Sequence, residues 1–163
     1  MNEVYHEFLL QRKKSLVGII VTIILSISAV GVLIWFSLLG IILAAILGYI
    51  AYRVYISSDI EYEYLYLDKE LTVDKVMAKR KRKRLMVYKL DKMEIVAQIG
   101  SSKLDEYKRR STNYKTKDYS SGYENTENKK YGIYYDGEYK VIIEAPEEFM
   151  KAMYNQAPRK VFL

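Results

Sequence analysis

The hydrophobic and polar positions divide this chain into one long apolar stretch and a polar remainder. Residues 16–52 contain no charged side chain and consist mainly of Ile, Leu, Val and Ala. A helix needs about 20 apolar residues to cross about 30 Å of hydrocarbon, so the stretch is long enough for two crossings and too long for one. It is also far longer than the apolar region of a cleaved signal peptide. The pattern predicts a two-helix transmembrane hairpin over residues 15–56, with helices at about 16–36 and 38–56.

Small residues recur at four-residue spacing on both predicted helices. They are Gly18, Thr22, Ser26 and Ala29 on the first helix, and Gly40, Ala44, Gly48 and Ala51 on the second. Folding the chain at Trp35, Phe36 and Ser37 brings Ala29 near Ala44, Ser26 near Gly48 and Thr22 near Ala51. Small faces let helix backbones approach closely in lipid, so we expect these residues to form the helix-packing contact. Two alternatives stay open: small residues are common in membrane helices, and the stripes could instead pair two copies of the chain.

After the hairpin the pattern changes to the period of two that is typical of strands. Ile60, Tyr62, Tyr64 and Tyr66 alternate with Glu61, Glu63, Leu65 and Leu67. The same reasoning predicts strands at 60–67, 71–77, 85–90, 93–99, 131–135 and 138–144. Asp136-Gly137 between the last two is a strong hairpin signal. Residues 103–130 are poor in aliphatics; they predict a short helix at 104–110, a weak strand at 114–119 and a mobile loop at 120–130.

The chain ends with an amphipathic helix. Pro146 suits a first helical position, Glu147 and Glu148 suit the positive end of the helix dipole, and Pro158 ends the pattern. We therefore predict a membrane α-helical hairpin plus an α+β soluble domain at 57–163. That domain has six to seven antiparallel strands in a bent sheet or partial barrel capped by a C-terminal helix, an element order like that of pleckstrin-homology (PH) domains. Residues 1–14 are predicted to be an N-terminal tail, either an interfacial helix with Val4, Tyr5, Phe8 and Leu9 on one face or a frayed end.

Charge predicts the orientation of the hairpin. The net charge is +6, Arg12, Lys13 and Lys14 precede the first helix, Arg53 ends the second, and the turn between them is uncharged. Because cytoplasmic flanks carry the excess of Lys and Arg, both termini are predicted to be cytoplasmic in a multi-pass protein of the plasma membrane.

The composition argues against catalysis and metal binding. The 163 residues include no Cys and a single histidine, His6, so no thiol nucleophile, His-pair metal site or Ser-His-Asp triad can form within one chain. The carboxylates are scattered, and no phosphate-loop or calcium-loop pattern occurs. We expect a non-enzymatic protein without a cofactor.

Six consecutive cations form the sharpest chemical feature: Lys79, Arg80, Lys81, Arg82, Lys83 and Arg84. The first interpretation is contact with anionic headgroups of the cytoplasmic leaflet, where each cation near the surface contributes about 1 kcal/mol. The second is a solvated connection between strands. The third, phosphate contacts to nucleic acid, lacks an accompanying recognition helix and is the least favoured.

Three segments resemble a known family. They are MNEVYHEFL at the start, DIEYEYLYLDKELTVDKVMAKRKRKR in the centre and APRKVFL at the end. They are similar to a family of short two-span bacterial membrane proteins of low-GC Gram-positive bacteria, defined by a domain of unknown function. Residues 64–96 also resemble bacterial PH-like domains. The resemblance implies location and fold, and it implies no catalytic residues.

The predicted function is therefore a membrane-anchored interaction or scaffold module that faces the cytoplasm. Its expected partners are the bilayer, anionic headgroups, a protein partner or further copies of itself. Two alternatives remain: an accessory subunit of a transporter or envelope complex, and an unrecognised enzyme. The predicted spans carry no charged side chain before Arg53. This favours the interaction or scaffold module over a transporter subunit, because ionisable groups within spans mark substrate paths.

Overall fold

The computed structural model describes residues 5–110 and 114–163, which form two compact units. One unit comprises Lys13–Glu61 and Val76–Lys81 and contains a pair of helices. The other comprises the segment ending at Arg12 together with Tyr62–Lys75 and Arg82–Leu163, and it contains most of the strands. The helical unit is thus an insertion between parts of the β-rich unit, and each is described here by itself.

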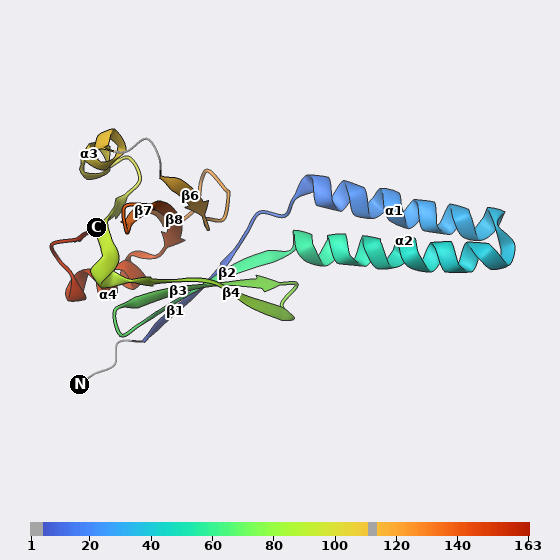
Figure 1. Ribbon diagram of the computed structural model, residues 1–163, viewed down its shortest axis with the longest axis horizontal. Helices are drawn as coiled ribbons and strands as arrows, with labels where there is room; N and C mark the ends of the chain where they lie inside the picture. The colour runs from blue at the N-terminus through green and yellow to red at the C-terminus, as the bar shows by residue number, and fades with distance from the viewer. Residues whose placement is uncertain (1–4, 111–113) are drawn as a thin grey trace. The chain divides into compact units, whose positions relative to one another are not determined.

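The helical unit is an antiparallel hairpin of α1 (Leu16–Trp35) and α2 (Ser37–Ser58), drawn in blue to cyan in Figure 1. The side chain of Ser15 caps α1 by accepting a hydrogen bond from the Gly18 backbone N–H at 3.2 Å. A tight turn at Phe36 joins the helices. The spans Leu16–Trp35 and Leu38–Ser58 are long and apolar enough to cross a membrane by length and composition.

The two helices meet along a seam that repeats at alternating four- and three-residue steps. The half-buried or buried positions with this spacing are Gly18, Thr22, Leu25, Ala29 and Val32 on α1, and Gly40, Ala44, Leu47, Ala51, Val54 and Ser58 on α2; Gly31 and Ile56 are half-buried outside it. This spacing is that of a heptad seam, which keeps one stripe of each helix facing its partner. The other faces are exposed, and α1 has no fully buried residue.

The first sheet has the strand order β1-β2-β3-β4. Its strands are β1 (His6–Gln11), β2 (Ile60–Leu67), β3 (Glu70–Met77) and β4 (Lys81–Lys89). The turns between the last three strands have left-handed backbones, with φ of 47° and 63° at Asp68 and Lys69 and of 48° and 55° at Ala78 and Lys79. Consecutive left-handed residues are the geometry that matches the twist of a two-stranded hairpin.

The second sheet has the order β6-β8-β7-β5-β9. Its strands are β5 (Met93–Gln98), β6 (Lys115–Asp118), β7 (Lys129–Tyr135), β8 (Tyr139–Ala145) and β9 (Val161–Phe162). β7 pairs antiparallel with β5 and β8, while β6 and β9 add parallel edges. Asp136 and Gly137 form the β7–β8 turn with φ of 53° and 66°, which confirms the predicted hairpin.

Aromatic side chains fill the space between the two sheets. Tyr64 and Tyr66 of β2 are fully buried and lie 6.2 and 6.5 Å, centroid to centroid, from Phe149 of α4 (Glu147–Gln156). The Tyr64 hydroxyl donates to the Tyr119 carbonyl at 2.7 Å, which links the first sheet to the segment after β6. A 3-10 turn (Leu90–Lys92) connects β4 to β5, and α3 (Ser102–Arg110) buries Leu104 against the second sheet.

The structure corrects the predicted strand content. The described residues contain nine strands in two sheets, where the sequence predicted six or seven in one bent sheet. Residues 6–11 of the predicted tail form the strand β1. The local sequence pattern missed this strand because its partner β2 follows only after the whole hairpin. The predicted mobile loop begins with buried residues: Ser121 donates from its backbone and hydroxyl to Glu144 at 3.0 and 2.7 Å. Residues 1–4 of the predicted tail, and residues 111–113 between the predicted short helix and weak strand, lie outside the described residues.

Candidate functional site

The basic segment, residues 79–84, is divided between a turn and a strand. Lys79 and Arg80 lie in the β3–β4 turn, and the four cations from Lys81 onward begin β4. It is therefore not the simple strand connection that one sequence interpretation expected. All six side chains are exposed.

Two of these cations are held by carboxylates within the first sheet. Arg82 donates to Glu63 Oε1 at 2.5 Å, and Arg84 Nε lies 3.6 Å from Asp74 Oδ1. Both carboxylates are buried, with 6% and 11% of their side chains exposed. Buried carboxylates need such partners, so Arg82 and Arg84 serve the stability of the sheet.

A third carboxylate, that of Glu7, influences the pKa of Glu63. Burial raises the pKa of Glu63, a hydrogen bond with Glu7 raises it further, and the Arg82 guanidinium opposes both. The pKa of Glu7 is lowered, first by the hydrogen bond that it accepts from Tyr5 and then by the one with Glu63. Glu63 is thus the member of the pair that holds a proton more readily.

The remaining four cations are available to a ligand. Lys79, Arg80, Lys81 and Lys83 form no ion pair with the described residues. Three of them, Lys79 to Lys81, belong to the same compact unit as the helices. The structure thus distinguishes the two cations that pair with buried carboxylates from the other four, a distinction that could not be made from the sequence.

A cavity of about 610 Å³ lies beside the end of α2, within the helical unit. One wall comes from α2 and comprises Tyr49, Tyr52, Arg53, Val54, Ile56 and Ser57. The facing wall comes from the β3–β4 turn and comprises Met77, Arg80 and Lys81. Its volume falls in the range of small-molecule sites.

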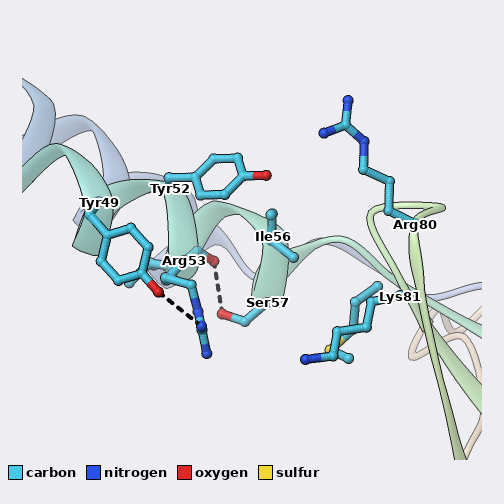
Figure 2. A pocket seen from close by; sticks show the side chains of 9 residues that line it. Tyr49, Tyr52, Arg53, Ile56, Ser57, Arg80 and Lys81 are labelled. Atoms are coloured by element: carbon cyan, nitrogen blue, oxygen red, sulfur yellow. Dashed lines mark hydrogen bonds between the residues drawn. The ribbon is translucent and has the colours of Figure 1, made fainter.

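Figure 2 shows how the polar groups lie around this cavity. The Arg53 guanidinium donates to the Tyr49 hydroxyl at 3.3 Å, one turn earlier on α2. The Tyr52 hydroxyl points toward the side of the cavity where Arg80 stands, and Lys81 extends toward Ser57. Cations thus approach the same space from the helix and from the turn.

A smaller cavity of about 260 Å³ adjoins the first and shares Tyr52, Ile56 and Arg80 with it. It also contains Asp59, whose Oδ1 atom is buried without a hydrogen bond. Lys14 Nζ lies 3.6 Å from the same oxygen. Lys14 therefore compensates the one carboxylate among the residues that line these two cavities.

The predicted helix-packing residues do not all lie on the seam. Gly18, Thr22, Ala29, Gly40, Ala44 and Ala51 lie there at half-buried or buried positions. Ser26 and Gly48 do not: Ser26 is exposed, and a Cβ atom added at Gly48 would meet no atom within 4 Å. The seam alternates steps of four and three residues, so residues spaced strictly four apart do not all lie on it. Leu25 and Leu47 occupy the seam positions that were expected for Ser26 and Gly48.

A family model matches residues 2–163, nearly the whole chain, and its description is "Bacterial PH-like domain". The chain belongs to this bacterial PH-like domain family (DUF6106). The match includes the two apolar helices as well as both sheets, so the hairpin is part of what the family model describes. Neither the curated proteins nor the solved structures contain a match to the chain.

Sequence reasoning on this PH-like protein missed the cavity. The sequence feature that could have indicated the cavity is the spacing of Tyr49, Tyr52 and Arg53, which puts a cation and two aromatic rings on neighbouring positions of one helix face. Their partners Arg80 and Lys81 follow after a complete hairpin of β2 and β3, so no local pattern joins them. No group of three or more His, Asp and Glu side chains in the described part of the chain could hold a metal ion.

Proposed function

We propose that this PH-like protein is a non-catalytic, membrane-anchored interaction module whose β3–β4 turn contacts anionic headgroups of the cytoplasmic leaflet. The observation that carries the proposal is the position of three cations, without an ion-pair partner among the described residues, in one compact unit with two apolar helices. Lys79, Arg80 and Lys81 belong to that unit, and the latter two share a cavity with the end of α2. Cations in this position meet phosphates at the surface that the helices cross.

The fold supports an even number of crossings. β1 precedes the hairpin and β2 follows it, yet both are neighbours in one sheet. A sheet forms on one side of a membrane, so the two flanks of the hairpin must lie on the same side. Arg12, Lys13 and Lys14 on one flank and Arg53 on the other support the cytoplasm as that side, with both termini there.

Aromatic residues support the placement of both ends of the helices. Trp35 is 84% exposed at the hairpin turn, and Tyr49, Tyr52 and Tyr55 are exposed toward the other end of α2. Trp and Tyr concentrate at membrane–water interfaces, where the ring meets hydrocarbon and the polar atom meets water. No ionisable group other than Tyr49 and Tyr52 lies in residues 16–52, which favours an anchor over a substrate path.

The proposal is tested by the depth of the turn in bilayers of different charge. The full chain carries Lys79→Cys with a fluorophore, which leaves five cations of the basic segment, and is reconstituted with headgroup-linked nitroxide quenchers. In bilayers containing phosphatidylglycerol the label should be quenched, and quenching should weaken as salt shortens the Debye length from about 10 Å at 0.1 M to about 3 Å at 1 M. Equal, salt-independent quenching in neutral phosphatidylcholine bilayers would contradict leaflet contact through charge.

A further inference from the structure

We infer that the 610 Å³ cavity beside α2 binds one anionic glycerophospholipid, with its phosphate on Arg53, Arg80 and Lys81 and an acyl chain against the apolar wall. The inference rests on the proposed function, because it requires the end of α2 to lie at the membrane surface. It goes further by replacing a diffuse electrostatic contact with a defined site for a single lipid.

Charge complementarity is the first argument. Three of the nine residues that line the cavity are cations, and no carboxylate lines it. Arg80, Lys81 and Arg53 form no ion pair with other described residues, and Arg53 donates a hydrogen bond to the Tyr49 hydroxyl at 3.3 Å. A phosphodiester has the acceptor oxygens with which these guanidinium and ammonium groups can form charged hydrogen bonds.

The apolar wall is the second argument, and it favours a lipid over a free anion. Val54, Ile56 and Met77 line the same cavity as the cations. From Ser57 back to Tyr49 the α2 wall extends about 12 Å at 1.5 Å per residue, from the surface into the apolar part of the helix. A soluble phosphate would leave this wall exposed to water, whereas a lipid covers it with hydrocarbon.

The test uses the full chain in neutral detergent and native mass spectrometry with phosphatidylglycerol or phosphatidylcholine added at equal concentration. Two double variants remove the same charge from the same segment. Arg80→Gln with Lys81→Gln changes the cavity, while Lys79→Gln with Lys83→Gln changes cations outside it. A third variant, Ser57→Trp, fills the cavity and leaves every charge in place.

Wild type should bind one phosphatidylglycerol in preference to phosphatidylcholine. The cavity double variant and Ser57→Trp should each lower its affinity about tenfold or more, and the matched double variant about threefold or less. Glycerophosphoglycerol, the headgroup without chains, should not displace the bound lipid. Circular dichroism of each variant should retain the wild-type spectrum.

Three results would overturn the site. Equal losses in the two double variants would mean that the surface charge acts as a sum, which contradicts a defined site and leaves the proposed leaflet contact standing. Displacement by glycerophosphoglycerol would make the ligand a free phosphodiester. Equal binding of both lipids by wild type would remove the site, and the quenching experiment then decides separately whether the turn contacts the leaflet.

Discussion

The two units of this protein bury apolar groups in opposite ways. In the β-rich unit, tyrosines such as Tyr64, Tyr88 and Tyr131 are buried almost completely between strands and helices. In the helical unit, α1 has no fully buried residue, and Ile and Leu side chains along both helices are exposed. Water would not tolerate such a surface on a folded chain, whereas hydrocarbon would. By length and composition, the two helices are suited to cross a membrane, whereas the β-rich unit has the buried core of a domain folded in water.

The units also differ in what their polar groups do. The β-rich unit matches buried carboxylates with cations or hydroxyls, as at Glu63 with Arg82 and Glu144 with Ser121. In the helical unit, Arg80 and Lys81 line a cavity and form no ion pair with the described residues. The same basic segment thus contains cations paired with buried carboxylates and cations that line a cavity.

The largest effect should come from truncating a core aromatic of the β-rich unit. Tyr64→Ala removes ring contacts to Phe8 and Phe149 and a hydrogen bond to Tyr119, so the free energy of unfolding should fall by about 3–5 kcal/mol. Ile27→Ala, at a position 67% exposed on α1, should change it by less than about 1 kcal/mol. Denaturant unfolding followed by the near-ultraviolet tyrosine signal measures both. Similar losses would contradict the contrast between the two units.

A smaller effect should distinguish a seam glycine, Gly40, from an exposed glycine on the outer face of α2, Gly48. A Cβ atom at Gly40 would lie 2.7 Å from the Val32 carbonyl oxygen, whereas one at Gly48 meets no atom within 4 Å. Gly40→Leu should therefore loosen the hairpin by about 1–3 kcal/mol, and Gly48→Leu should be tolerated. The measurement is the yield of a disulfide within one chain between cysteines at Ala29 and Ala44. Crosslinks only between chains would indicate that the stripe joins two copies.

The smallest effect concerns the paired cations. Arg82→Ser leaves Glu63 without its cation and should cost about 1 kcal/mol at neutral pH, while Lys83→Ser, beside it and unpaired, should cost less than about 0.5 kcal/mol.

The cost of Arg82→Ser should depend on pH in one direction. The raised pKa of Glu63 means that its neutral form suits the fold, so this group favours folding below its ordinary pKa of 4.5 and the benefit is lost as pH rises through the folded-state pKa. Losing Arg82 raises that pKa further. The cost should therefore shrink as pH falls through the folded-state pKa of Glu63, which lies above 4.5, and a cost that grows on acidification would contradict this assignment.

Local patterns predicted the elements that depend on neighbours in sequence. The tyrosine alternation of β2, the Asp136-Gly137 turn, and the start of α4 after Pro146 agree with the structure. β1 was missed because its partner strand follows the whole hairpin. The same distance hides Arg82 from Glu63 and Arg53 from Arg80, so both the structural role of the basic segment and the cavity required the three-dimensional arrangement.

Pairing of β1 with β2 also affects how the β-rich unit can be isolated. A fragment of residues 57–163 lacks β1 and should fold poorly, because the first sheet would lose its edge strand together with Phe8 and the buried Leu10. Replacing residues 13–59 by a short turn keeps β1 beside β2 and should give a soluble, cooperatively unfolding protein. Thermal unfolding by circular dichroism compares the two designs. A well-folded 57–163 fragment would contradict the contribution of β1.

The central claim is that the hairpin crosses the membrane twice and keeps the β-rich unit in the cytoplasm. The chain has no native Cys, so single cysteines at Ser37 in the helix turn and at Asp136 in the β7–β8 turn can be labelled individually. In intact bacterial cells, a membrane-impermeant maleimide should label the Ser37→Cys protein, and the Asp136→Cys protein only after permeabilisation. Labelling of Asp136→Cys in intact cells, or protection of Ser37→Cys there, would contradict the two-span account.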